Sequence, residues 1–185
     1  MKVLYLVDSY PNEKIAAPNI FVHNQVLGVK NEGYDVAVLK LDLRSIKNKR
    51  KWGFEQYEYE GIRVFVMSFP VGPIPHLLMK IYRFSTLQGI KRIMKLWGKP
   101  DIIHAHFGNM ANCAYYVKNK YGIPYVVTEH SSSIIKGNLS DNEKKLLKVG
   151  YDGAQYIWAV GNQLKERIAE FYNGQIDVLP NIVPD

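Results

Sequence analysis

Two apolar runs in the middle of the chain, residues 102–105 and 125–128, each lead into residues that can do chemistry. These residues are His104, His106 and Gly108 at the end of the first run and Glu129, His130 and Ser131 after the second. Imidazole and carboxylate groups hydrogen-bond ligands, move protons and bind metals. If both runs are parallel strands, their carboxyl ends meet at one edge of a sheet, where α/β folds bind ligands. The sequence therefore predicts a functional site at that edge.

His104 and His106 are two residues apart, so a strand points both side chains to the same face. His104 lies deeper in the run, and we expect it to be a structural histidine held by a hydrogen bond. His106 lies at the tip, where loops carry binding residues, and we expect it to contact a ligand.

These histidines also fit a metal centre. His104, His106 and His130, with Asp8 as a further candidate, offer the ligand types of a zinc or iron site. Against this, the chain has no HExxH motif, and no other carboxylate has a spacing that demands a metal. A metal-dependent hydrolase and a non-catalytic α/β binding module stay open as alternatives.

Apolar runs and helical patterns alternate along the chain and predict an α/β fold. The expected strands are 2–7, 35–41, a hairpin of 54–59 and 62–68, 102–105, 125–129, 156–160 and 176–179. The expected helices are 20–32, 76–97, 111–121, 140–149 and 163–172. Asn19 and Ser140 are predicted helix N-caps, and Gly150 is predicted to end its helix. This order predicts a Rossmann-like, doubly wound and mostly parallel sheet with helices on both faces.

In the common strand order, strands 2–7 and 102–105 flank the point where the order reverses. Loops 8–19, 106–109 and 130–137 would then line one crevice. No GxGxxG motif follows the first strand and no Walker A motif is present, so a dinucleotide or P-loop site loses its main support.

The charge of the chain indicates anionic partners without identifying them. The 185 residues carry a formal net charge of +7, and the cations gather in 47–51 and 76–99. The second segment is an amphipathic basic helix, which suits an exposed helix or contact with an anionic membrane surface. No nucleic-acid-binding motif accompanies the charge, which argues against nucleic acid. The single cysteine, Cys113, suits a buried position and a reducing cytoplasm.

Four segments together resemble the amino-terminal domain of a GT-B fold, family-4 (group 1) glycosyltransferase. They are 18–25 (PNIFVHNQ), 100–106 (PDIIHAH), 122–131 (GIPYVVTEHS) and 178–185 (VLPNIVPD). They occur in the expected order and span nearly the whole chain, which makes the resemblance fairly specific.

The resemblance implies a retaining glycosyltransferase with two Rossmann-like domains facing each other across a cleft. Residues 1–179 would bind a glycan or lipid-linked acceptor, and 180–185 would begin the linker to a donor-binding domain of the same polypeptide. A UDP- or GDP-sugar would bind mainly that second domain, so this domain binds no cofactor and is expected to be inactive alone. The enzyme would take part in the biosynthesis of cell-envelope polysaccharide. It would act in the cytoplasm, either free or as a peripheral protein at the inner face of the membrane.

The resemblance also implies site residues. His130 matches the family's histidine near the transferred sugar, where it would hydrogen-bond a sugar hydroxyl or the developing charge. Glu129 would orient His130 or bind acceptor hydroxyls. The remaining binding candidates are His106, Ser131, Asn19 and Asp8. Asn181 would serve the interdomain hinge.

Overall fold

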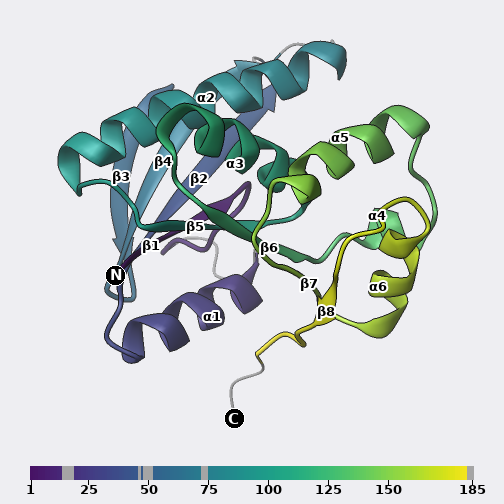
Figure 1. Ribbon diagram of the computed structural model, residues 1–185. Helices are drawn as coiled ribbons and strands as arrows, with labels where there is room; N and C mark the ends of the chain where they lie inside the picture. Colours follow the sequence, from purple (N-terminus) through teal and green to yellow (C-terminus); the bar gives the residue numbers. More distant parts are fainter. Residues whose placement is uncertain (14–18, 46, 48–51, 72–74, 183–185) are drawn as a thin grey trace.

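One eight-stranded sheet runs through the molecule in the order β3-β4-β2-β1-β5-β6-β7-β8 (Figure 1). The computed structural model describes residues 1–13, 19–45, 47, 52–71 and 75–182. The strands are β1 Lys2–Val7, β2 Asp35–Ser45, β3 Gly53–Tyr59, β4 Ile62–Val71, β5 Ile102–His106, β6 Tyr125–Glu129, β7 Ile157–Ala159 and β8 Asp177–Val178. The helices are α1 Ile20–Asn31, α2 Pro75–Leu96, α3 Gly108–Tyr121, α4 Ser132–Ile135, α5 Asp141–Asp152 and α6 Asn162–Ala169. Only β3 pairs antiparallel to its neighbour, which confirms the predicted, mostly parallel α/β sheet.

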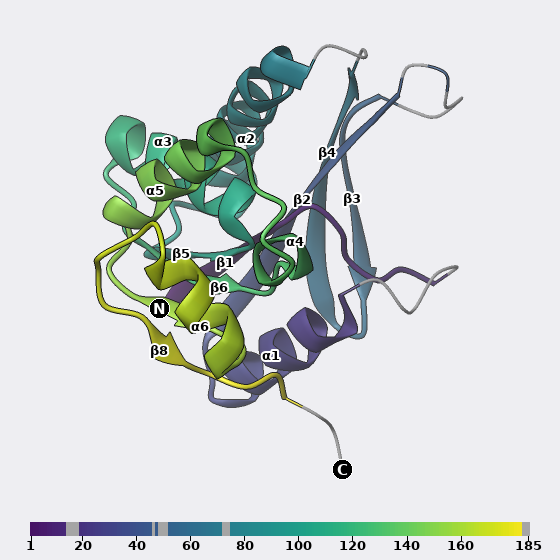
Figure 2. The ribbon, with the colours of Figure 1, turned by 90° about the vertical axis from the view of Figure 1, so that its right-hand side faces the viewer.

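Helices cover both faces of the sheet, as predicted (Figure 2). Helix α1 packs on one face, and α2, α3 and α5 pack on the other. The side chains of β1 divide between these layers. Tyr5 and Val7 join the apolar cluster under α1, whereas Leu4 and Leu6 join the larger cluster under α2 and α3. This division follows from the two-residue repeat of a strand and explains why β1 is apolar throughout.

Strands β1 and β5 lie side by side at the centre of the sheet, with Val3 opposite Ile102. From this pair the chain builds outward in opposite directions, to β2 on one side and to β6 on the other. The predicted reversal point is therefore confirmed. Parts of three predictions fall outside the described residues, namely positions 14–18 of the first loop, 48–51 of the basic run and 183–185 of the linker.

Several predicted boundaries were wrong, and pairing across the sheet explains the largest error. Strands β2 and β4 continue to Ser45 and Val71, because they pair with each other beyond the end of β1. Residues 69–71, beyond the predicted strand 62–68, therefore belong to β4. The predicted loop 130–137 contains the short helix α4.

Gly150 does not end its helix, contrary to the prediction, because α5 runs on to Asp152. A Cβ at Gly150 would lie 2.6 Å from the backbone nitrogen of Asn112 and 2.8 Å from the carbonyl carbon of Ala111. The glycine thus lets α5 approach the backbone of α3 closely. Local sequence gives no sign of this use, since a glycine near a helix end usually marks a stop.

Helix α2 is amphipathic, as predicted, but its buried stripe combines large and small residues. Ile90 is buried and Leu87, Met94 and Trp97 pack against the core. Ser85, Thr86 and Gly89 are buried as well, whereas Phe84 is 50% exposed. Small residues were missed because helical patterns are usually read from large apolar residues. A Cβ at Gly89 would lie 3.2 Å from the Leu39 side chain, so a small residue there keeps the helix close to β2.

Replacing Gly150 by alanine should lower the free energy of unfolding by about 2 kcal/mol, because an added methyl group meets rigid backbone. The matched control is Gly28→Ala in α1, where the nearest atom to a new Cβ is 3.9 Å away. That change should raise stability by up to about 1 kcal/mol through helix propensity alone. Urea unfolding followed by circular dichroism measures both, and equal effects of the two substitutions would contradict the packing role of Gly150.

Candidate functional site

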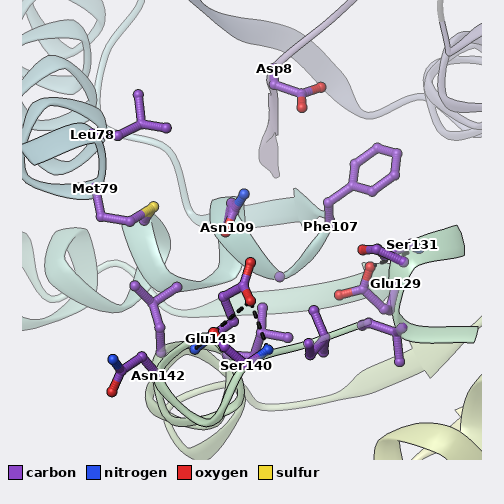
Figure 3. A pocket seen from close by; sticks show the side chains of 16 residues that line it. Asp8, Leu78, Met79, Phe107, Asn109, Glu129, Ser131, Ser140, Asn142 and Glu143 are labelled. Atoms are coloured by element: carbon purple, nitrogen blue, oxygen red, sulfur yellow. Dashed lines mark hydrogen bonds between the residues drawn. The ribbon is translucent and has the colours of Figure 1, made fainter. Parts of the chain in front are cut away.

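A cavity of about 790 Å³ opens at the carboxyl edge of the sheet, beside the reversal point (Figure 3). Asp8 reaches it from the end of β1, Leu78 and Met79 from the start of α2, and Ser140 and Glu143 from the start of α5. The predicted loops after β1, β5 and β6 all contribute. The contributions of α2 and α5 were not predicted, because they depend on how these helices pack. The full lining is Asp8, Leu78, Met79, Phe107, Gly108, Asn109, Glu129, Ser131, Ser133, Ile134, Leu139, Ser140, Asn142, Glu143, Leu146 and Leu147.

Glu129 is fully buried at the base of the cavity and is saturated with hydrogen bonds. Its Oε1 accepts the backbone N–H groups of His130 and Ser131, each at 3.0 Å, and its Oε2 accepts the Tyr151 hydroxyl at 2.6 Å. Burial raises the pKa of this carboxyl, and these donors together with the Gly108 N–H oppose the rise. The carboxylate thus holds the backbone of the β6–α4 turn, which agrees with the orienting alternative given for Glu129.

The β6–α4 turn sends neighbouring side chains in opposite directions. Ser131 lines the cavity, where its Oγ hydrogen-bonds the Oγ of Ser133 at 2.7 Å. His130 instead faces a small hollow formed with Phe21, Gln25 and residues 179–182. The predicted catalytic residue His130 and the predicted binding residue Ser131 therefore lie on two sides of one turn.

The His130 ring is held by aromatic and imidazole neighbours. Its centroid lies 4.5 Å from that of Phe21 and 5.1 Å from that of Phe107, and its Nε2 lies 3.0 Å from Nδ1 of His106. Burial lowers the pKa of His130 to about 4, and the neighbouring Asn181 side chain opposes the shift. The ring is therefore neutral at neutral pH, which suits a hydrogen-bonding role.

His104 and His106 lie on the same face of β5, as predicted, with ring centroids 4.4 Å apart. His104 Nε2 lies 2.7 Å from the Thr128 hydroxyl, the kind of bond expected for a structural histidine. His106 is fully buried between His104 and His130 and does not line the cavity. Burial lowers the pKa of His104 to about 3 and that of His106 well below its usual range.

The stacking of these rings gives the metal-centre alternative no support. Two of the nitrogens that would bind a metal, His106 Nδ1 and His130 Nε2, are hydrogen-bonded to each other. In the part of the chain that the structure describes, no group of three or more His, Cys, Asp or Glu side chains is arranged to hold a metal ion.

Asp8 and Asn19 come together at the entrance to α1. Burial raises the pKa of Asp8, and the Asn19 side chain and the charge of Lys40 oppose the shift. Asn19 has a left-handed backbone, with φ 53°, and its Nδ2 donates to the Ser9 carbonyl at 3.1 Å. Asn19 occupies the N-cap position of α1, as predicted, but its side chain forms no capping hydrogen bond. Ser140 and Glu143 form the predicted capping box.

Phe107 is a site residue that the sequence did not indicate. It precedes α3 and lines the cavity with φ 71° and ψ 150°, a backbone conformation costly for any residue with a Cβ. The following residue must be glycine, because a Cβ at Gly108 would lie 2.2 Å from Leu147 and 3.0 Å from Oε2 of Glu129. The sequence also did not single out Asn109, Ser133 and Asn142. Polar residues are common at the ends of helices and strands, so their type alone does not indicate that they line a cavity.

The buried neutral histidines predict a loss of stability in acid. Between pH 6.5 and about 4 the unfolded chain protonates at His130 while the folded chain does not. The free energy of unfolding should therefore be fully retained above pH 6.5 and fall as the pH drops toward 4. Replacing His130 by glutamine removes one such proton. The change in the free energy of unfolding with pH should therefore become smaller by roughly 1.4 kcal/mol per pH unit.

Urea unfolding at pH 7, 6 and 5 measures this effect in the parent and the variant. Because the raised pKa of Glu129 acts in the opposite direction, the difference between the two proteins isolates the histidine. Identical slopes in the parent and His130→Gln would show that His130 is not buried in neutral form.

Comparison with known proteins places the fold. The chain is similar to sucrose-phosphate synthase from Thermosynechococcus elongatus, with a TM-score of 0.70 and 14% identity over 97% of this chain and 48% of that one. It is similar to the lipopolysaccharide outer core galactosyltransferase WaaB, with a TM-score of 0.62 and 16% identity over 99% of this chain and 46% of that one. UDP-GlcNAc 2-epimerase from Methanocaldococcus jannaschii gives a TM-score of 0.58 and 14% identity over 98% of this chain and 46% of that one. No match was found among curated proteins.

The structural likenesses are to the fold, and the chain spans about half the length of these three proteins. The family match is more specific. Glycosyltransferase Family 4 matches residues 19–185, a range that holds most of the cavity lining as well as His130 and Asn181. The chain therefore belongs to Glycosyltransferase Family 4, with the fold of a GT-B amino-terminal domain.

Proposed function

We propose that the chain is the acceptor-binding domain of a retaining glycosyltransferase. The enzyme would transfer a sugar from a UDP- or GDP-sugar to a glycan or lipid-linked acceptor. The observation that carries this proposal is the 790 Å³ cavity at the reversal point of the sheet, in a chain that belongs to Glycosyltransferase Family 4. Parallel α/β sheets bind their ligands at that position.

The cavity has the composition of a sugar site. Ser131, Ser133, Asn109 and Asn142 offer hydroxyl and amide groups, and the apolar remainder can contact the C–H faces of a sugar ring. Small-molecule sites commonly combine such an apolar lining with a few convergent polar groups. These features support acceptor binding at the side of the turn that Ser131 faces.

We place the transferred sugar on the other side of the turn, beside His130. His130 Nδ1 is buried, and none of the described residues forms a hydrogen bond with it. Residues 179–182, which end the described chain, pass over the same ring. A donor-binding domain joined at that point would deliver its sugar next to His130. The likeness to about half of each longer structure supports such a second domain as partner.

The basic helix α2 supports contact with an anionic membrane surface, although its free charge is smaller than the sequence indicated. Arg83 donates to Asn112 at 2.9 Å and lies over the Tyr116 ring, so it binds within the domain. Lys80, Lys91 and Lys95 are exposed on α2, as are the apolar side chains of Leu77 and Phe84. No helix in the described ranges is long and apolar enough to cross a membrane.

Replacing His130 by alanine in the full-length protein should lower kcat for sugar transfer by about 100-fold, because a hydrogen bond that strengthens in the transition state is lost. The acceptor KM should change little, since the acceptor cavity lies on the opposite side of the turn. The assay follows a panel of labelled UDP- and GDP-sugars with glycan and lipid-linked acceptors, and NMR of the product tests for a retained anomeric configuration.

Thermal unfolding of His130→Ala serves as the control for folding. A folded variant with unchanged kcat would remove His130 from the reaction. If the full-length parent neither transfers sugar nor hydrolyses any donor, the proposed activity itself is wrong.

Charge reversal at Lys91 and Lys95 should weaken membrane binding. The Lys91→Glu/Lys95→Glu variant should lose about 30-fold or more in affinity for phosphatidylglycerol vesicles, since each of the two lost basic residues contributes about 1 kcal/mol near such a surface. Sedimentation with vesicles measures this. The matched control is Lys144→Glu/Lys145→Glu on α5, and equal losses in both variants would contradict a specific role for α2.

A further inference from the structure

We propose that the acceptor cavity takes an uncharged sugar and disfavours sugars that carry phosphate or carboxylate. This inference rests on the proposed function and names the substrate class of the same site. It runs against the net charge of +7, which by itself indicates an anionic ligand.

Helices α3 and α5 both begin at the cavity, and each holds a carboxylate at its N-terminus. Helix N-termini attract anions through free N–H groups and the helix dipole. At α3, the Gly108 N–H and the Tyr151 hydroxyl are directed to Glu129. At α5, Glu143 Oε2 accepts the Ser140 N–H at 2.8 Å and the Ser140 hydroxyl at 2.6 Å. The protein's own carboxylates thus lie at both of these helix N-termini, where an anionic ligand would otherwise be attracted.

The rest of the lining adds to this exclusion. Asp8 contributes a third acidic side chain, at the end of β1. None of the described residues that line the cavity is Lys or Arg, although the chain has 24 of them. An entering phosphate would therefore face like charges without a basic partner. Like charges brought together in this way discriminate strongly between ligands.

The neutral groups of the lining fit an uncharged sugar. Ser131, Ser133 and Asn109 can exchange hydrogen bonds with ring hydroxyls, and the Phe107 side chain offers an apolar surface at the rim. Phe107 also has the costly backbone conformation described above, with φ 71°. Conformations of this kind persist where the surrounding structure fixes them, often at ligand sites.

The test compares methyl glycosides of glucose, galactose, mannose and N-acetylglucosamine with their 6-phosphates on the full-length protein. Saturation-transfer NMR measures binding, and a transfer assay with the accepted donor measures kcat/KM. At least one neutral glycoside should bind and be used more than tenfold better than its phosphate. Ser133→Tyr, which fills the cavity, should abolish that binding, whereas Ser132→Tyr, its neighbour outside the lining, should not.

Glu143→Gln probes the charge directly, because glutamine can also form a capping box and the helix start is preserved. In this variant the ratio of kcat/KM for the neutral sugar to kcat/KM for its phosphate should fall about fivefold, because one repulsive charge is removed. Glu166→Gln, an exposed carboxylate on α6, should leave the preference unchanged.

Tighter binding of the 6-phosphates than of the neutral glycosides overturns the inference. So does a result in which Ser133→Tyr abolishes the binding of none of the glycosides. Because binding is measured without a donor, it decides this point even if the protein transfers no sugar. Absence of transfer together with Ser133-sensitive binding of a neutral sugar would count against the proposed activity and would leave the ligand class supported.

Discussion

The buried carboxylate of Glu129 is the interaction on which the site depends. It joins the end of β6 to the N-terminus of α3 through Gly108 and to α5 through Tyr151. A buried carboxylate is costly unless donors surround it, and here two backbone N–H groups of the following turn complete the set. Removing the carboxylate would leave several buried donors without a partner, so the positions of the turn, the helix start and the cavity base are linked.

This linkage explains how one short turn separates two tasks. With the backbone at His130 and Ser131 fixed by the same oxygen, their side chains point to opposite sides. The serine lines the large cavity and the histidine faces α1 and the end of the described chain. An acceptor and a donor sugar could then approach one turn from two directions, which fits the proposed transfer between two bound sugars.

The strand order and the carboxyl-edge location of the site could be predicted, because both follow from alternation along the chain and from the preferred hand of parallel crossovers. The capping box at Ser140 could also be predicted, since it is encoded within four residues. The roles of Gly150 and Gly108 could not, because each depends on an element far away in the sequence. His106 shows the same limit, since alternation gave its face but not the ring of His130 that covers it.

The hydrogen bond between His106 Nδ1 and His130 Nε2 has a consequence for tautomers. Both rings are neutral at neutral pH, so one hydrogen lies between them and its position fixes both tautomers. If His106 donates, His130 carries its hydrogen on Nδ1 and presents a donor there; if His130 donates, Nδ1 is an acceptor. By moving protons between nitrogens, the buried pair can therefore switch His130 Nδ1 between hydrogen-bond donor and acceptor without any change in net charge.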